Sequence, residues 1–424
     1  MSLHNRAIRI RLLERAGGKL GRLVVLTGAR QTGKTTLVRA AFPEMTYVSL
    51  EDPAVRPTFS RMSAVELSDR YPAAIFDEVQ KVPSLVETVK AVYDSSPEAR
   101  YLLLGSSQIL LLAKVKESLA GRVAIEELWP LTIPEMMTDS WESPVRSSRM
   151  IRWLSDPRPS RLSLFGGLPA ASPGFASATR QLEHYLEFGG MPLVLDPELT
   201  PTERYRWLRD FQRTYLERDV TDLAALRDLE PFVVAQRVIA GRTGRLVNFS
   251  DLARSASISP DTAHRFLRYL ELSYQVLLLP PFFRNVEKRL SKSPKVHVLD
   301  PGILRVLSNR TGELTGEEFE SAVVSEIWKQ IKNAGLRIEL FHLRTYDRRE
   351  VDLLLELEDG FVPIQIKKAV RVAPADARSL RDLSELLDKP VLHSFVLSLD
   401  RDARELVPGV HALPVAWSLG PADS

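Results

Sequence analysis

The amino-terminal third of the chain alternates short apolar runs with polar, helix-forming stretches. Residues 23–27 form an apolar, β-branched run, and the glycine-containing loop 28–33 separates it from an amphipathic stretch that ends near 39. The runs 73–76 and 101–104 contain no charged residue, which is typical of central strands in a parallel sheet covered on both faces. The pattern therefore predicts an α/β fold for this part of the chain.

The segment 138–180 has a different character. Serine, proline, glycine and arginine are frequent there, with only short apolar stretches between them. We expect an insertion or a mobile lid that contains one helix, from 147 to 154. A charged helix is then predicted from 201 to about 226.

Residues 231–300 have the pattern of a helix-turn-helix followed by a hairpin. Ser250 is placed to cap a short helix, and Ser259 with Pro260 begins a second one, because serine favours the N-cap position and proline the first helical position. The stretches 274–279 and 295–299 are strand-like and bracket the hairpin. Together these elements predict a winged helix.

Basic side chains gather on this predicted winged helix. The apolar residues of its second helix recur at helical spacing, which leaves a polar face outward. Such a face, beside a basic wing, is suited to DNA phosphates, although winged helices also serve as lids and protein contacts. The candidate DNA-binding residues are His264, Arg265 and Arg268 on the helix and Arg284, Lys288, Arg289 and Lys292 on the hairpin.

The carboxyl-terminal part predicts a helix followed by a small sheet. The helix covers 317–332, and strands follow at 337–343, 349–356 and 361–367, the last two joined by an Asp-Gly hairpin turn. A further helix is predicted from 375 to 387.

One carboxylate stands out in this sheet. Asp352 lies inside an apolar strand, where an unpaired charge is costly to bury. Gln365 and Lys367 are two residues apart on the partner strand and therefore share a face. Glu320 on the preceding helix could complete the cluster. An ordinary ion pair between Asp352 and Lys367 is the alternative.

Composition excludes several classes of protein. The chain has 424 residues, enough for two to four domains at about 100–200 residues each. It has no cysteine, which excludes disulfides, thiolate metal sites and a cysteine nucleophile. No window is apolar enough for a membrane span and the amino terminus has no secretory pattern, so we expect a cytoplasmic protein. The net charge of +3 is too small to indicate nucleic-acid binding by itself.

The loop after the first strand has the spacing G-x-x-x-x-G-K-[ST] between a strand and a helix. Its glycines let backbone N–H groups turn toward phosphate oxygens at a helix N-terminus. Lys34 would reach the β and γ phosphates of ATP, and the Thr35 hydroxyl would bind Mg²⁺. The predicted ATP-binding residues are Gly28, Ala29, Arg30, Gln31, Thr32, Gly33, Lys34, Thr35 and Thr36.

The strand at 73–76 ends in Asp77-Glu78. Asp77 would hold the Mg²⁺, directly or through water, and Glu78 would polarise the attacking water as a general base. The run 101–104 leads to Ser107 and Gln108, small polar side chains where the water and the γ-phosphate would sit. A helix over 109–119 then precedes Arg122 and another strand at 123–128.

This order of motifs resembles the core of AAA+ ATPases over residues 20 to about 135. The resemblance implies that Ser107 or Gln108 is the sensor residue and that Arg122 is an arginine finger acting on a neighbouring subunit, which would require oligomers. A surface ion pair or a structural cap is the alternative for Arg122. The strings 185–192 and 215–220 are similar to those of a bacterial and archaeal AAA+ family that carries a carboxyl-terminal domain of unknown function.

The carboxyl-terminal pattern resembles the PD-(D/E)xK nuclease fold, including archaeal-type Holliday junction resolvases. The resemblance implies that Asp352 binds Mg²⁺, that Lys367 positions water and that Glu320 supports the metal. Gln365 departs from the pattern, because that fold usually has a carboxylate there. Either this is a working Q-x-K variant, or the fold is retained only for binding or assembly, which the lost charge favours.

We therefore expect four regions: an AAA+ core with a parallel sheet at 1–137, a lid and helical connector at 138–230, a winged helix at 231–310, and a nuclease-like domain at 311–424. The expected function is Mg²⁺-dependent ATP hydrolysis coupled to DNA binding or remodelling. The alternative is a nucleotide-dependent switch or scaffold that binds protein partners. A homo-oligomer is compatible with both, and a membrane is not an expected partner.

Overall fold

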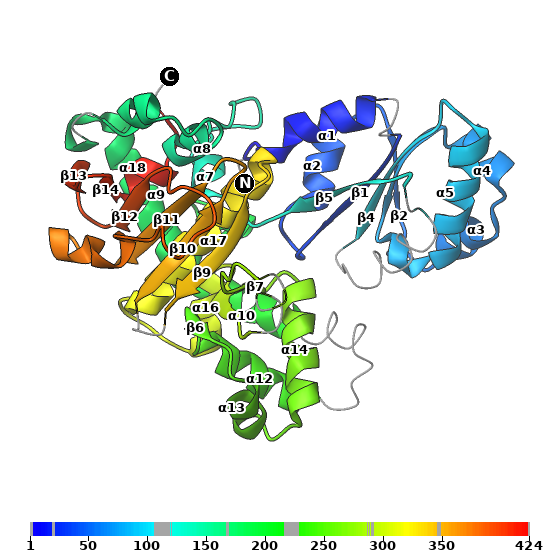
Figure 1. Ribbon diagram of the computed structural model, residues 1–424. Helices are drawn as coiled ribbons and strands as arrows, with labels where there is room; N and C mark the ends of the chain where they lie inside the picture. Colours follow the sequence, from blue (N-terminus) through cyan, green and yellow to red (C-terminus); the bar gives the residue numbers. More distant parts are fainter. Residues whose placement is uncertain are drawn as a thin grey trace.

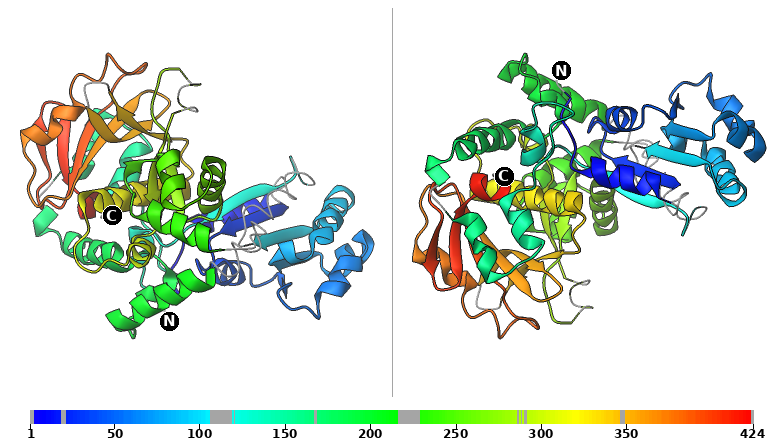
Figure 2. Two further views of the ribbon diagram at one scale, coloured as in Figure 1. Left: turned by 90° about the horizontal axis from the view of Figure 1, so that it is seen from below. Right: turned by 90° about the horizontal axis from the view of Figure 1, so that it is seen from above.

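The computed structural model describes residues 3–18, 22–105, 119, 121–166, 169–215, 229–285, 287, 289, 292–345 and 349–422. Figure 1 shows three lobes: the amino-terminal part in blue and cyan, a helical part in green, and a carboxyl-terminal part in orange and red. The teal segment lies with the carboxyl-terminal part. The amino-terminal lobe extends away from the other two in all three views (Figures 1 and 2).

The amino-terminal lobe is a five-stranded sheet in the order β2-β3-β4-β1-β5, with every pair parallel. This confirms the predicted α/β core. Its strands are β1 (Leu23–Gly28), β2 (Thr46–Ser49), β3 (Ala73–Asp77), β4 (Arg100–Gly105) and β5 (Ala124–Leu128), and its helices are α1 (Ile8–Gly17), α2 (Lys34–Ala41), α3 (Arg56–Arg61), α4 (Ala64–Arg70) and α5 (Pro83–Ser95).

The apolar runs are continuous because both faces of this sheet are covered. Leu23 and Val25 on β1 pack with α3, α4 and α5, whereas Val24 and Leu26 pack with α1 and α2. Since successive residues of a strand point to opposite faces, each face needs its own apolar set. The parallel order also places the ends of β1 and β3 at one edge, which positions the loop described below.

The segment 138–180, expected to be an insertion or a mobile lid, packs into the carboxyl-terminal core, so the prediction of a mobile lid was wrong. Trp153 is buried against Phe395 with ring centroids 5.1 Å apart, and Phe165 packs on the same ring. The proline-rich sequence does interrupt the helices, but its apolar side chains are still buried away from water. The elements are α7 (Ile133–Met136), α8 (Arg149–Leu154), η2 (Pro159–Phe165), η3 (Pro169–Ala171) and α9 (Pro173–Phe188).

The green lobe contains helices at the two positions predicted for the helix-turn-helix, and the strands predicted to bracket the hairpin. Ser259 caps α14 as expected, whereas α13 is capped by Asn248, two residues before the predicted Ser250. The hairpin strands form an antiparallel sheet in the order β6-β8-β7. The elements are η4 (Pro192–Leu195), α10 (Pro201–Tyr215), α12 (Glu230–Ala240), β6 (Arg245–Leu246), α13 (Phe249–Ser255), α14 (Pro260–Leu272), β7 (Val276–Leu279), β8 (Lys295–Val298) and α16 (Pro301–Ser308).

The carboxyl-terminal sheet has the order β13-β14-β12-β11-β10-β9, and α17 packs against it. The predicted helix over 375–387 is wrong: only η6 (Pro374–Leu380) forms, and Asp382 takes a left-handed φ of 51°, which a helix cannot continue through. The remaining elements are α17 (Gly316–Ala334), β9 (Glu339–Arg344), β10 (Glu350–Glu356), β11 (Phe361–Lys367), β12 (Ser394–Ser398), β13 (Arg404–Val407), β14 (Val410–Pro414) and α18 (Val415–Leu419).

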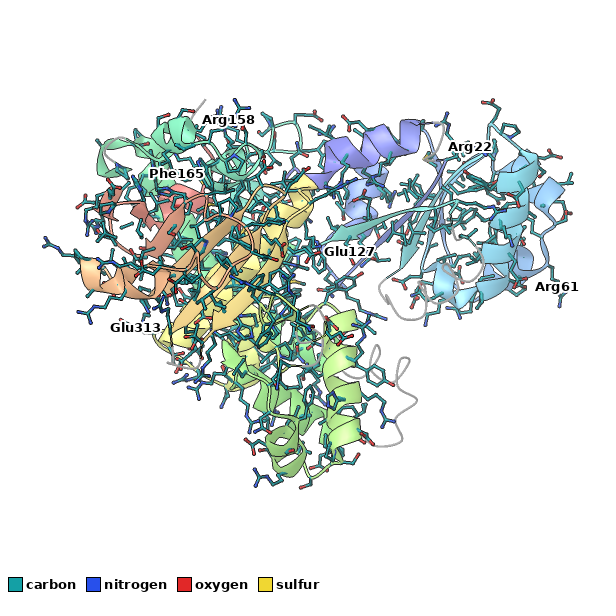
Figure 3. The ribbon with its side chains drawn as sticks, viewed as in Figure 1. Arg22, Arg61, Glu127, Arg158, Phe165 and Glu313 are labelled. Carbon is teal, nitrogen blue, oxygen red and sulfur yellow. The ribbon has the colours of Figure 1, made fainter. Side chains whose placement is uncertain are left out.

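Figure 3 places Glu127, near the end of β5, at the junction of the amino-terminal lobe with the rest of the molecule. Burial raises the pKa of this carboxyl group.

Among the described residues, no helix is both long and apolar enough to span a membrane.

Candidate functional site

The loop between β1 and α2 has the geometry of a phosphate cradle. Gly28 has a φ of 149°, and a Cβ atom there would lie 2.2 Å from the Leu128 carbonyl oxygen on the neighbouring strand. Gly33 has a left-handed φ of 92° immediately before the first residue of α2. Both glycines are therefore required by the backbone path, and the loop ends at a helix N-terminus, where anions bind well.

Lys34 curls back into this loop. Its Nζ donates to the carbonyl oxygens of Gly28 and Ala29, both at 2.8 Å, and its side chain is buried. The ammonium charge is thus held within the loop, which suits an anionic ligand of several oxygens.

Thr35 and Asp77 come together as predicted. The Thr35 hydroxyl donates to Asp77 Oδ2 at 2.6 Å, and the Tyr47 hydroxyl donates to the same oxygen at 2.8 Å. Burial and Asp77 raise the pKa of Tyr47 to about 12, so Tyr47 stays a neutral donor. Hydroxyl and carboxylate oxygens side by side fit a magnesium ion. Sequence reasoning missed Tyr47, whose position in an edge strand carries no motif.

Glu78 has a strained backbone next to this pair. Its φ is 56°, in the left-handed region that a residue with a Cβ seldom adopts. Its carboxylate accepts a hydrogen bond from the Gln80 side chain in the 3₁₀ turn η1 (Val79–Lys81). The strand end thus places two adjacent carboxylates at different positions, Asp77 against Thr35 and Glu78 against Gln80. Ser107 and Gln108, the predicted sensor residues, lie outside the described residues.

Arg122 lies at the amino end of β5, the opposite end of the parallel sheet from the loop that follows β1. Its Nε is 2.8 Å from Asp94 Oδ1 at the end of α5, and both side chains are partly exposed. The structure thus brings Arg122 to Asp94 rather than to the loop of its own chain.

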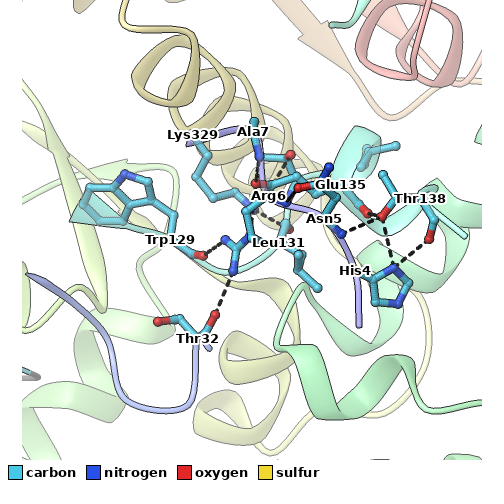
Figure 4. Close-up of polar contacts among 12 residues, drawn as sticks. His4, Asn5, Arg6, Ala7, Thr32, Trp129, Leu131, Glu135, Thr138 and Lys329 are labelled. Carbon is cyan, nitrogen blue, oxygen red and sulfur yellow. Dashed lines mark hydrogen bonds and ion pairs between the residues drawn. The ribbon is translucent and has the colours of Figure 1, made fainter. Parts of the chain in front are cut away.

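Arg6 is a residue of the site that sequence reasoning missed. Figure 4 shows its guanidinium bridging three segments: it donates to the carbonyl oxygens of Thr32 at 2.7 Å and Trp129 at 2.5 Å, and to Glu135 Oε1 at 3.1 Å. Arg6 and Glu135 are buried. The phosphate loop is thereby tied to residues 129–135, the connector between the lobes. No motif indicates Arg6, because its partners are mostly backbone atoms.

The same connector is held from the carboxyl-terminal part. Glu326 on α17 accepts from the Ile133 N–H at 2.7 Å, and Lys329 donates to the Leu131 carbonyl oxygen at 3.3 Å. The green lobe reaches the loop as well, through a 2.5 Å hydrogen bond between the hydroxyls of Tyr274 and Thr27. The green lobe thus contacts the residue before the phosphate loop, and the carboxyl-terminal part contacts the connector that Arg6 ties to the loop.

A cavity of about 290 Å³ opens beside the loop. Gly33, Thr36 and Leu37 line it from the loop and α2, His4 lines it from the amino-terminal segment, and Trp141 and Pro192 close it. Its size and its mixture of apolar walls with a few polar groups are those of a small-ligand site.

The helix α14 presents His264, Arg265 and Arg268 to solvent, as predicted. His264 stacks on Phe249, and Arg268 pairs with Glu271. These side chains form one exposed polar face.

The predicted basic hairpin differs from expectation. Arg284 donates to the backbone carbonyl oxygens of Glu385, Leu386 and Leu387, and Arg289 pairs with Glu356 while its guanidinium lies over Phe282. Both arginines thus hold the hairpin against the carboxyl-terminal domain, Arg284 while still exposed and Arg289 with its side chain mostly covered. Lys292 is exposed, and Lys288 lies outside the described residues.

The carboxyl-terminal cluster forms, with two additional members. Asp352 Oδ2 accepts from the Gln365 side chain at 2.5 Å and from the Ile366 N–H at 2.8 Å. Glu320 is 3.0 Å from Lys295 Nζ, which lies 2.5 Å from Glu350. The Lys367 side chain has no hydrogen bond or ion pair to a described residue, whereas its backbone carbonyl oxygen accepts from the Ala369 N–H at 2.8 Å. We find no group of three or more His, Asp or Glu side chains arranged for a metal ion among the described residues.

Comparison with known families follows the same division of the chain. Residues 21–137 match a family described as an AAA domain. The carboxyl-terminal residues 315–417 match a Domain of unknown function (DUF4143), and residues 179–314 between them match a Domain of unknown function (DUF8612). The chain thus carries an AAA-type P-loop domain followed by two domains without an assigned function.

Uncharacterized proteins of Mycobacterium bovis and Mycobacterium tuberculosis are similar over nearly the whole chain. Each is 29% identical over 406 residues, which cover 93% of this chain and 78% of the relative. Their names assign no activity.

Solved structures are similar at a low level. The Walker-type ATPase of Pyrococcus abyssi has a TM-score of 0.40 at 17% identity, covering 70% of this chain and 95% of its own. A signal transduction ATPase with numerous domains from Pyrococcus horikoshii has a TM-score of 0.27 at 11% identity, covering 77% of this chain and 45% of its own. TM-scores this low give the likeness no weight for function.

Proposed function

We propose that the protein is an ATPase that binds ATP with Mg²⁺ at the loop between β1 and α2. The observation that carries the proposal is the contact of Thr35 with Asp77 directly below the phosphate cradle. Thr35 and Asp77 would hold the magnesium ion, whose chemistry would be to neutralise the phosphate charge. Lys34 binds the phosphates from within the loop. The cavity beside Gly33 and Leu37 binds the adenine ring of ATP.

Hydrolysis needs a base for the attacking water, and Glu78 is the proposed residue. It follows Asp77 at the strand end and takes a strained backbone conformation, which is frequent at functional positions. Its contact with Gln80 holds the carboxylate to one side of Asp77. The two carboxylates can therefore divide the work, with Asp77 supporting the metal and Glu78 accepting the proton.

The test measures nucleotide binding and hydrolysis separately. Lys34→Ala should abolish binding of a fluorescent ATP analogue. Glu78→Gln should keep binding within about threefold of wild type and reduce hydrolysis by about 10²–10³-fold, the range for removing a positioned general base. Glu87→Gln, on the exposed face of α5, is the matched control and should change neither. Normal hydrolysis by Glu78→Gln would show that another group activates the water.

We further propose that ATP turnover is coupled to DNA through a winged helix formed by α12, α13, α14 and the β6-β8-β7 sheet. The exposed face of α14, with His264, Arg265 and Arg268, supports this. Arginine guanidinium groups on a helix beside a hairpin can bind DNA phosphates and the edges of the bases. The alternative, a switch that binds protein partners, is favoured by the hairpin arginines, which are already bound to the carboxyl-terminal domain.

DNA coupling is tested by adding duplex, junction and single-stranded DNA to the ATPase assay at low salt. We expect stimulation that Arg265→Glu with Arg268→Glu abolishes. Arg158→Glu, an exposed arginine outside the proposed winged helix, is the control and should leave stimulation unchanged. Neither stimulation nor a gel shift with any of these DNAs would reject the DNA role and leave the protein-binding switch.

A further inference from the structure

The cluster around Asp352 contains a positive charge that the nuclease-like pattern does not include. Lys295 comes from β8, in the three-stranded sheet of the green lobe, and its side chain is only 3% exposed. Its Nζ lies 3.0 Å from Glu320 on α17 and 2.5 Å from Glu350 on β10. The ammonium group therefore sits among carboxylates that belong to a different domain.

One Asp352 oxygen and the Gln365 side-chain oxygen are also used within the chain. Asp352 Oδ2 accepts two hydrogen bonds, from Gln365 and from the Ile366 backbone. The Gln365 side-chain oxygen Oε1 in turn accepts a hydrogen bond from the Ser379 hydroxyl at 2.7 Å. Gln365 thus acts as a bridge between Asp352 and Ser379, which a carboxylate at that position could not do, because it has no N–H to donate.

Burial makes the lysine necessary. Asp352 and Glu320 are buried, and burial raises the pKa of both carboxyl groups, while Lys295 opposes the shift. Buried carboxylates without a cation would repel one another in a medium of low polarity. A metal ion or an ammonium group can supply the missing positive charge, and here the ammonium group is present.

We propose that the acidic cluster of the carboxyl-terminal domain is a cation site whose cation is the Lys295 ammonium of the same chain. It fastens the β6-β8-β7 sheet to α17 and β10 and closes the site to divalent metals. The domain is then a docking platform for the hairpin, and Arg284 and Arg289 reinforce the same contact at its other end. It follows that the domain does not cleave DNA.

Two buried histidines indicate what would happen without the lysine. His297 lies two residues after Lys295, on the same face of β8, and His342 lies on β9. The ring nitrogens of His297 have no hydrogen-bond partner among the described residues, and the His342 ring lies beside the Ser293 backbone. Burial lowers the pKa of both, to about 4 for His342, and Lys295 lowers them further. Of the two, His342 lies near Glu350, so a metal ion that replaced the ammonium would meet a nitrogen donor as well as oxygen donors.

The test removes the ammonium and supplies a metal. In thermal melts without nucleotide, Lys295→Met should lower the melting temperature by roughly 5–10 °C, because a buried ion pair loses one partner. Millimolar Mn²⁺ should restore most of that loss, and adding Asp352→Asn should remove the rescue. Lys292→Met, an exposed lysine on the same hairpin, is the matched control and should match wild type with and without Mn²⁺.

Wild-type protein supplies the opposite measurement. Calorimetric titration with Mn²⁺ in the absence of nucleotide should show no binding that depends on Asp352, and supercoiled or branched DNA should stay intact with Mg²⁺ or Mn²⁺. If Lys295→Met fails to fold, the double variant with Glu320→Gln removes one charge of each sign and should fold without metal. Asp352-dependent Mn²⁺ binding or DNA cleavage by wild type, or equal stability of Lys295→Met and Lys292→Met, would overturn the proposal.

Discussion

At the scale of single residues, a pair of histidines in the carboxyl-terminal sheet should make the protein sensitive to acid. His393 Nε2 and His411 Nδ1 are 2.8 Å apart, and the His393 ring packs against Trp153 and Phe395. Burial lowers the pKa of His393 to about 4, and His411 lowers it further, whereas Glu405 opposes the shift. The His393 ring is therefore neutral at pH 7.

The direction of the pH effect follows from this depressed pKa. An unfolded histidine binds a proton near pH 6.5, whereas folded His393 resists it until about pH 4. Its contribution to stability is thus complete above about pH 6.5 and is lost as pH falls toward 4. His393→Phe, which fills the aromatic cluster without titrating, should flatten this part of the curve of urea midpoint against pH. The exposed His264→Phe is the control, and an equal effect of both variants would contradict the assignment.

At the scale of elements, the turn between α14 and β7 is coupled to the phosphate loop. Tyr274 adopts a left-handed φ of 63°, its hydroxyl meets Thr27 in β1, and its ring packs edge-to-face on Trp129 with centroids 4.9 Å apart. Because Thr27 directly precedes Gly28, a shift of this turn would displace the start of the phosphate loop. We expect the contact to link nucleotide binding to the helical lobe.

A double-mutant cycle tests this link. Tyr274→Phe keeps the ring and removes one hydrogen bond, which should cost about 1 kcal/mol of unfolding free energy, and Thr27→Val should cost a similar amount. If the two hydroxyls interact, the double variant should lose less than the sum of the single variants. Tyr269→Phe, on the same lobe, is the control. Strict additivity in unfolding and in ATP affinity would show that the hydroxyls are not coupled.

Elements also show where local patterns mislead. The run 375–387 contains helix-forming residues, but Leu380, Leu383 and Leu387 reach the sheet core through turns. Likewise 138–180 has the composition of a lid, yet Trp153 and Phe165 belong to the carboxyl-terminal core. In both segments burial against a distant sheet outweighs local propensity.

At the scale of the whole molecule, the position of Arg122 raises the question whether hydrolysis needs a second subunit. It lies at the end of the sheet away from its own phosphate loop, so an action on nucleotide would be in trans. We expect Arg122→Ala to lose most ATPase activity and to recover part of it when mixed with Lys34→Ala subunits, because mixed interfaces then pair an intact loop with an intact arginine. Asp94→Ala breaks the ion pair but keeps Arg122 and should stay active. Equal loss in both variants, without recovery on mixing, would assign Arg122 a structural role.

The amino-acid sequence alone determined the phosphate loop, its glycines and the Asp77-Glu78 strand end. These features depend on neighbours within a few residues and on a parallel sheet that the continuous apolar runs already imply. Only the tertiary structure decided that Arg6 and Tyr274 hold the loop, that Arg284 and Arg289 face the carboxyl-terminal domain, and that Lys295 enters the acidic cluster. The physical reason is that charges and hydrogen-bond donors act over a few ångströms in space, and their partners here are separated by 25 to 247 positions of the chain. Spacing along the chain carries no record of which buried carboxylate meets which cation.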